Sequence, residues 1–132
     1  MILVDSSVWI DYFNKIKSPQ CDFLHQCLGA VPILTGDIII AEVLRGFKSD
    51  KAFLKAKELL GSLFYRDLLG RDVAILSATI YRQCRKKGIT INKPNDLFVS
   101  AFCIENKIPL LHSDNDFTII ANHTKLKVIN VS

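Results

Sequence analysis

The chain has 132 residues, 49% of them hydrophobic, and a formal net charge of +4 from 17 lysines and arginines and 13 acids. This length and composition exclude intrinsic disorder and predict a single domain, residues 1–132, with a sizeable core. No apolar run is long enough to cross a bilayer and Met1–Asp5 lacks the basic start of a signal peptide, so we expect a cytoplasmic protein without membrane contact.

Short apolar runs alternate with amphipathic stretches along the first half of the chain. Ile2–Val4 is β-favouring and shows no polar alternation, which is typical of a strand buried on both faces. Ser6 and Ser7 provide N-cap chemistry for an amphipathic helix directly after it. The same patterns predict a strand at 33–34 and helices over 8–13, 19–28, 38–45 and 50–60.

The second half of the chain continues this alternation. Asp72 begins the clearest helix, which has apolar residues on one face and basic residues in its last turns before Gly88. Further elements are expected as short strands at 64–69, 108–111 and 127–131 and as helices over 97–106 and 117–121. Strands that alternate with helices predict an α/β domain with a parallel sheet, where binding sites form at the carboxyl ends of the strands.

Five acidic residues lie where such a topology can bring them together. Asp5 follows the first strand, and Asp114 and Asp116 follow a later one. Glu42 and Asp96 lie near the starts of helical patterns. Carboxylates that converge on one sheet edge repel one another unless a cation neutralises them. The set therefore indicates a divalent-metal site, and such a site beside basic surface indicates phosphodiester chemistry.

Each of these acids also has an ordinary structural explanation. Asp5 and Asp96 occupy positions that suit helix N-termini. Asp114 and Asp116 suit a turn, and a residue such as Glu42 commonly lies on the solvated face of a helix. The metal interpretation depends on the agreement of all five positions with one α/β topology.

The four cysteines form no CxxC pair and are expected to be free structural thiols. Cys21, His25 and Cys27 are close in sequence, which raises the alternative of a zinc site. No fourth ligand stands at the spacing of a zinc finger or ribbon, so that alternative is disfavoured.

The chain resembles the PIN domain family, specifically the VapC-type toxins of prokaryotic toxin–antitoxin pairs. Four blocks carry the resemblance, in the order ILVDSSVWIDYF, AEVLRGF, KKGITI after the basic helix, and NDLFVSAFCIENKIPLLHSDNDF. They cover nearly the whole chain. The resemblance implies a three-layer α/β/α fold with a central parallel sheet of four to five strands.

The resemblance also assigns residues. The family's acidic quartet falls on Asp5, Glu42, Asp96 and Asp114. Asp116 falls on a further acidic position of the family. Ser7 falls on a position where the family has a small hydroxyl or amide residue that helps to order the site. His112 and Ser113 stand where members more often have Val or Leu followed by Thr. The hydroxyl is kept, and His112 is expected to be structural rather than to contact substrate.

The function implied is that of an endoribonuclease toxin, which hydrolyses RNA phosphodiesters with a metal-activated water and so inhibits translation. All five acids are expected to be catalytic and to bind the metal. Their oxygen ligands favour Mg²⁺ or Mn²⁺, as one ion or two. The three histidines show no paired arrangement for acid–base catalysis through the RNA 2′-hydroxyl, which also favours a metal-activated water.

The implied partners are an RNA substrate, a cognate VapB-type antitoxin and a second copy in a homodimer. Without the five acids, the rest of the chain carries a formal charge of +9, which suits a polyanion. The densest basic cluster of the chain consists of Arg82, Arg85, Lys86 and Lys87. This cluster either contacts RNA phosphates or is only a solvated helix end.

Two other classes of function are less favoured. A noncatalytic RNA-binding or protein-interaction module on the same fold would be expected to have lost some of the acidic set, and none is lost. A phosphatase that forms an aspartyl-phosphate would want an aspartate two residues after Asp5, where Ser7 stands.

Overall fold

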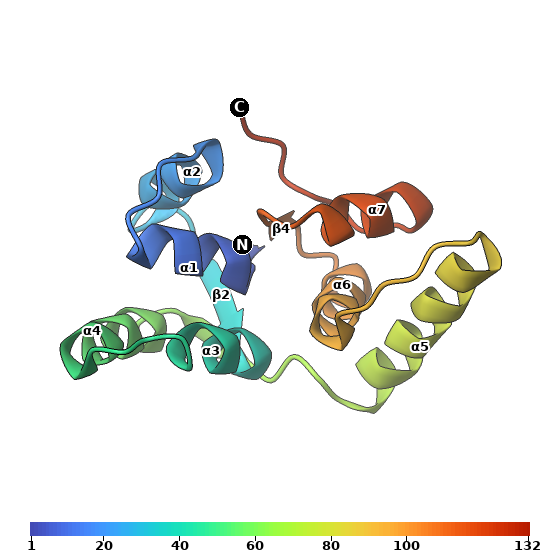
Figure 1. Ribbon diagram of the computed structural model, residues 1–132, viewed down its shortest axis with the longest axis horizontal. Helices are drawn as coiled ribbons and strands as arrows, with labels where there is room; N and C mark the ends of the chain where they lie inside the picture. The colour runs from blue at the N-terminus through green and yellow to red at the C-terminus, as the bar shows by residue number, and fades with distance from the viewer.

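The computed structural model describes residues 1–132 and shows seven helices around a four-stranded parallel sheet (Figure 1). The strands are β1 (Ile2–Val4), β2 (Ile33–Gly36), β3 (Phe64–Arg66) and β4 (Leu110–Leu111). The helices are α1 (Ser6–Phe13), α2 (Pro19–Cys27), α3 (Asp37–Leu44), α4 (Asp50–Gly61), α5 (Arg71–Lys86), α6 (Pro94–Asn106) and α7 (Asn115–His123). This architecture confirms the expected α/β fold with a parallel sheet.

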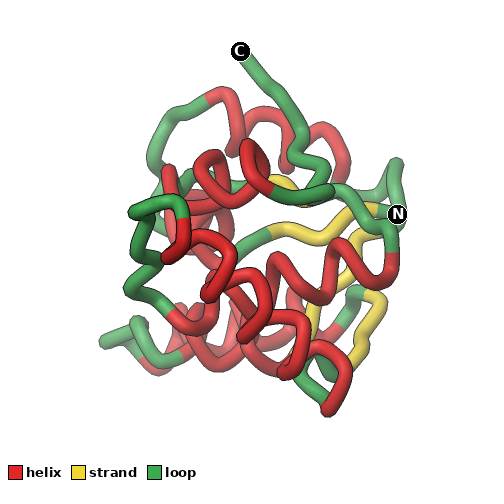
Figure 2. Tube along the Cα trace, turned by 90° about the vertical axis from the view of Figure 1, so that its right-hand side faces the viewer, coloured by secondary structure: helices red, strands yellow, loops and turns green.

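The strand order is β3-β2-β1-β4. The chain moves outward from β1 to β3 and then crosses back to place β4 on the other side of β1. Helices α1 to α4 therefore lie on one side of the sheet and α5 to α7 on the other, giving three layers (Figures 1 and 2). The direction of winding reverses between β1 and β4, and ligand sites of open parallel sheets form at the carboxyl ends of strands at such a reversal.

One hydrophobic cluster of 27 buried residues holds the layers together. Its largest fully buried side chains include Trp9 of α1, Phe102 of α6 and Phe117 of α7, which lie in both helical layers. Every residue of β1 and β4 is buried, in agreement with apolar runs that lack alternation. No helix has both the length and the apolar character that a membrane span requires.

Two expectations about local structure are wrong. The N-cap of α1 is Asp5, whose side chain accepts a hydrogen bond from the Ser7 amide, and the two serines lie inside the first turn. The expected strand at 127–131 is reduced to a single parallel bridge between Val128 and Leu110. Because β4 has only two residues, its outer edge offers pairing for little more than this bridge.

Two helices begin earlier than their apolar patterns indicate. Helix α6 starts at Pro94, a residue favoured in the first turn because its missing amide would be unpaired there. Helix α7 starts at Asn115 because Asp114 caps it, with its side chain accepting from the Asp116 amide. Both shifts place an acidic residue, Asp96 or Asp116, in a first helical turn.

Gly36 joins β2 to α3 at a point where the backbone of β3 passes close by. A Cβ atom on Gly36 would lie 2.3 Å from Leu68 Cγ and 2.5 Å from the Arg66 carbonyl oxygen. Gly36→Ala is expected to lower the free energy of unfolding by at least about 1–3 kcal/mol, because the Arg66 oxygen belongs to a paired strand and cannot easily move.

Gly61→Ala provides the matched control, since a Cβ there meets nothing within 4 Å. This second substitution should be neutral or stabilising by about 0.5–1 kcal/mol. Urea unfolding of both variants measures the difference. Equal stabilities would show that β3 yields to the added methyl group.

Candidate active site

The beginnings of three helices meet at the carboxyl ends of β1 and β4. Asp5 caps α1 and Asp114 caps α7, while Asp96 and Asp116 lie in the first turns of α6 and α7. Helix N-termini carry partial positive charge and stabilise carboxylates near them. The fold therefore gathers four acids at one edge of the sheet and partly offsets their mutual repulsion.

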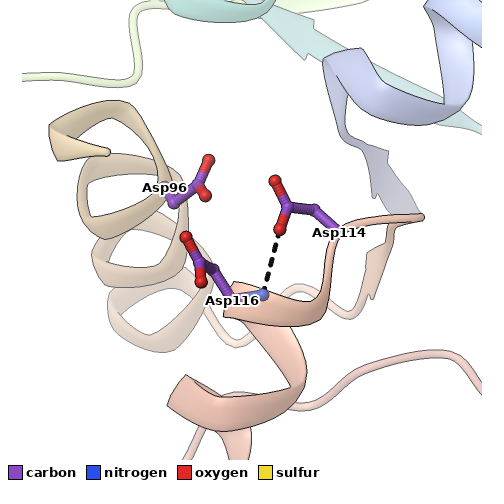
Figure 3. Close-up of side chains that lie close together, drawn as sticks. All are labelled: Asp96, Asp114 and Asp116. Carbon is purple, nitrogen blue, oxygen red and sulfur yellow. Dashed lines mark hydrogen bonds between the residues drawn. The ribbon is translucent and has the colours of Figure 1, made fainter. Parts of the chain in front are cut away.

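Three of these carboxylates form a tight group. Asp96, Asp114 and Asp116 each have a carboxylate oxygen that lies within 4.8 Å of an oxygen of the other two. The three side chains face a common space between the starts of α6 and α7 (Figure 3). The Asp116 amide donates to Asp114 Oδ1 at 3.0 Å, which fixes the turn that carries both residues.

Asp96 is the most unusual member of this group. Its residue is only 6% exposed, and its Oδ2 atom is buried without a hydrogen-bond partner. Burial, followed by the negative charges of Asp5 and Asp114, raises its pKa to about 7. A buried carboxylate oxygen that accepts no hydrogen bond, beside a group of other carboxylates, is a position that a cation would satisfy.

Asp5 adjoins the group but does not belong to it by this distance criterion. It is 3% exposed, and its Oδ2 accepts from the Ser7 amide at 3.0 Å. Burial raises its pKa despite the lowering effect of hydrogen bonds from Ser7, and the charge of Glu42 adds to the rise. Asp5 in turn contributes to the raised pKa of Asp96, so the charges of the two residues act on each other.

Glu42 lies farther along the same edge, on the neighbouring helix α3. It is half-buried, and its Oε1 accepts a hydrogen bond from Ser6 Oγ at 3.1 Å. Sequence reasoning missed Ser6, because a contact across 36 residues depends on how α1 and α3 are rotated against each other. Ser7, which was expected to order the site, accepts a hydrogen bond from the Ser113 amide at 3.0 Å and so ties α1 to the turn after β4.

Lys93 was also missed. Its ammonium group contacts Asp114 Oδ2 and lies 3.9 Å from Asp96 Oδ2, although the side chain is 59% exposed. Burial acts to raise the pKa of Asp114, but the hydrogen bonds from Lys93 and from the Asp116 amide hold it below its usual value. The signal that could have revealed Lys93 is a cation at the N-cap of α6, where the helix dipole disfavours positive charge.

His112 contacts the turn that carries Asp114 and Asp116. Its Nδ1 accepts from the Asp114 amide at 3.3 Å, and its ring lies 5.2 Å from the ring of Phe117. Burial lowers its pKa, which favours the neutral imidazole that this hydrogen bond requires. These contacts are those of a structural residue.

The four basic residues at the end of α5 are exposed, and none of them pairs with the acidic group. Arg85 donates to Thr90 Oγ1 at 2.8 Å, within the connection to α6. Cys21 and Cys27 are buried free thiols and form no metal-binding group with His25.

The donor set suits a hard divalent cation. Asp96, Asp114 and Asp116 offer oxygen atoms alone, as Mg²⁺ and Mn²⁺ prefer. The buried Oδ2 of Asp96 accepts no hydrogen bond, and its cationic neighbour is the Lys93 ammonium group 3.9 Å away. Lys93 carries the positive charge nearest to these oxygens. Asp5 and Glu42 extend the negative edge beyond the group of three.

Comparison with known proteins places this site in a family. The PIN domain matches residues 2–122 of the chain. The chain belongs to the PIN domain family. It is 32% identical to Ribonuclease VapC11 of Mycobacterium tuberculosis over 96% of each chain, and 32% identical to Ribonuclease VapC1 of Methanocaldococcus jannaschii over 83% of this chain and 72% of that protein.

Solved PIN structures share the fold across the full length. VapBC2 from Rickettsia felis, crystallised with a promoter DNA fragment, superposes with a TM-score of 0.78 at 19% identity and covers 100% of both chains. Mycobacterium tuberculosis VapC20, a toxin that cleaves the sarcin-ricin loop, superposes with a TM-score of 0.67 at 16% identity, over 96% of this chain and 99% of that one. These similarities confirm the three-layer PIN fold that the sequence resemblance implied.

Proposed function

We propose that this PIN domain is a metal-dependent endoribonuclease, the toxin of a type II toxin–antitoxin pair, and that it inhibits translation by cutting RNA. The observation that carries the proposal is the group of three carboxylates, including the buried Asp96 Oδ2 that accepts no hydrogen bond, located where the sheet reverses its winding. Full-length relatives named as VapC ribonucleases support the choice of RNA as the substrate.

The proposed division of roles follows the geometry. Asp96, Asp114 and Asp116 would hold Mg²⁺ or Mn²⁺, and Asp5 would complete the set from the end of β1. A bound divalent cation supplies a water activated for attack and neutralises charge on the scissile phosphate. Ser7 keeps the ends of β1 and β4 in register through its bond to Ser113.

Two further residues would act without being primary ligands. Glu42, which accepts from Ser6, is placed to bind through a water or to keep Asp5 oriented. Lys93, displaced from Asp114 when a cation binds, has the exposure and the reach to contact the RNA phosphates. The exposed Arg82, Arg85 and Lys86 stay as candidates for weaker phosphate contacts.

The proposed partners follow from the relatives. Structural neighbours include VapBC complexes of toxin and antitoxin, so we infer a VapB-type antitoxin that covers the acidic edge and a homodimer of the toxin. A guanidinium or ammonium group of the antitoxin would satisfy the carboxylates much as Lys93 does here.

Cleavage of single-stranded RNA by the purified protein tests the proposal. Cleavage is expected with Mg²⁺ or Mn²⁺ and should stop with EDTA, and the new ends should lack cyclic phosphates because water, not the 2′-hydroxyl, attacks. Asp5→Asn should reduce the rate strongly, while Asp22→Asn on the exposed surface of α2 should not. RNA binding without any metal-dependent cleavage would instead favour the noncatalytic module.

A further inference from the structure

A basic groove lies beyond the acidic site, between α5, the end of α6, the end of α7 and the segment that follows α7. It consists of two adjoining hollows of about 450 and 280 Å³, which share Ile104 and Lys125. The basic side chains that line them are Lys87, His123, Lys125, Lys107 and Lys127.

The charge of the basic groove is unbalanced. No aspartate or glutamate lines either hollow. The hollow between β3 and α5, in contrast, combines Arg66 and Arg71 with three acids, and the hollow beside α1 and α2 includes Asp22. Four lysines that line one surface without an acidic neighbour repel one another, and an anionic ligand would relieve that repulsion.

No lysine of the basic groove forms an ion pair. The only ion pairs in the protein are those of Lys93 with Asp96 and Asp114, so none of the groove lysines is neutralised by the fold. Gln83, Asn122 and Thr124 add polar groups to the rim, over a floor that includes Ile80 and Ile104. This combination suits a flexible polyanion that presents phosphates to the rim.

The basic groove and the acidic site are connected by shared elements. Helix α7 has Asp116 in its first turn at the acidic site and His123, its last residue, in the groove. At 1.5 Å per residue these two positions are about 10 Å apart along the helix axis. The connection from α5 to α6 likewise runs from Lys87 in the groove to Lys93 at the acidic group. Figure 1 shows the carboxyl end of α7 directed toward the end of α5.

We propose that the basic groove binds the phosphodiester backbone of single-stranded RNA a few nucleotides away from the scissile bond. This inference rests on the proposed function and adds a second contact region, formed by Lys107, Lys125 and Lys127 together with Lys87. A strand cut at the acidic site would continue along α7 into the groove. Such grooves bind by charge and are tolerant of sequence, so the contact provides affinity and length dependence rather than base readout.

Binding of a fluorescent single-stranded RNA, followed by anisotropy in EDTA over a range of salt concentrations, tests the proposal. The triple variant Lys107→Gln, Lys125→Gln, Lys127→Gln should bind at least tenfold more weakly than wild type. Its salt slope should be smaller by about 2, because each lost phosphate contact on a single strand removes about 0.7. The matched control, Lys48→Gln, Lys51→Gln, Lys57→Gln, makes the same charge change at exposed, unpaired positions and should retain nearly wild-type affinity.

Cleavage kinetics separate this inference from the proposed function. The groove variant should cut a fragment of roughly four nucleotides as wild type does, and should show a KM raised about tenfold, with unchanged kcat, on a long strand. The variant Lys107→Arg, Lys125→Arg, Lys127→Arg keeps the three positive charges and should bind the long strand as wild type does. Thermal melts confirm that all variants fold.

Each other outcome has a definite meaning. Equal losses in the groove and control variants would overturn the proposal, since general charge would then explain binding. Unchanged RNA affinity with lost binding of an acidic protein partner would also overturn it, by making the groove a protein interface. If wild type binds RNA through the groove but cuts nothing with any metal, the proposed function fails and the binding inference stands.

Discussion

Asp96→Asn is expected to abolish RNA cleavage and, at the same time, to stabilise the metal-free protein. Replacing groups that only hold a metal ligand in place costs about 10–100-fold in affinity or activity, so losing a ligand should cost at least about 100-fold. Asp96 joins the group of three carboxylates and has a buried oxygen that accepts no hydrogen bond. Its amide counterpart would still fill the site but would supply no negative charge.

The expected gain in stability has a definite pH dependence. The folded protein raises the pKa of Asp96 from 3.8 to about 7. A raised pKa means that the folded protein disfavours the ionised form of Asp96. The stability that neutral Asp96 contributes is therefore complete below about pH 4, falls as the pH rises, and is lost above about pH 7. Asp96→Asn does not ionise, so its stability advantage over wild type should grow between about pH 4 and pH 7. The advantage should be larger at pH 8 than at pH 5 by about 1–3 kcal/mol, the typical cost of an unsatisfied buried polar group.

Thermal melts of both proteins in EDTA at pH 5 and pH 8 measure this difference. His112 and Asp5 also have shifted pKa values, but they are present in both proteins and largely cancel in the comparison. Glu58→Gln, at an exposed position of α4, is the control for a simple loss of one negative charge. A variant that is less stable than wild type at pH 8 would show that Asp96 is favourably paired in the metal-free protein.

Strand ends were the most predictable part of the site. The unbroken apolar run of Ile2–Val4 identified β1, and the sequence alone placed Asp5, at its end, on the carboxyl edge of a parallel sheet. Asp114 follows β4 for the same reason. The role of Asp116 was harder to predict, yet it joins the group of three because the N-cap bond from its own amide to Asp114 turns both side chains inward.

Features that depend on side-chain direction or on distant segments could not be predicted. The bond of Ser6 to Glu42 requires the relative rotation of α1 and α3, which no local pattern encodes. The bridge at Val128 replaced an expected strand because pairing depends on the length of β4 and not on the β propensity of the tail. Lys107, Lys125 and Lys127 form no motif in the sequence, since only the fold brings them to one groove.

Affinity for Mn²⁺ is expected to rise about 100-fold between pH 5 and pH 8. A carboxylate must lose its proton before it can bind a metal, and Asp96, with a pKa of about 7, is mostly protonated at pH 5. Below pH 7 each unit of pH should change the apparent affinity by about tenfold, and above pH 7 the affinity should level off. Asp5, whose pKa burial also raises, acts in the same direction and steepens the dependence at low pH.

Titration calorimetry with Mn²⁺ in buffers of different ionisation enthalpy measures both affinity and proton release. Near pH 5.5 about one proton or more should leave for each ion bound, and near pH 8 almost none should. Lys93 would give up its contact with Asp114 when a cation binds, but the ordinary lysine pKa of 10.5 already lies above this range. Lys93 would therefore keep its proton and add nothing to the count.

Asp96→Asn is again the informative comparison. It should bind Mn²⁺ weakly, with a much smaller change in affinity between pH 6 and pH 8, because the group that titrates in that interval has been removed. If the variant kept the wild-type pH dependence, the proton would belong to another residue of the site. Asp5 would then be the candidate, because it is the other acid whose pKa burial raises.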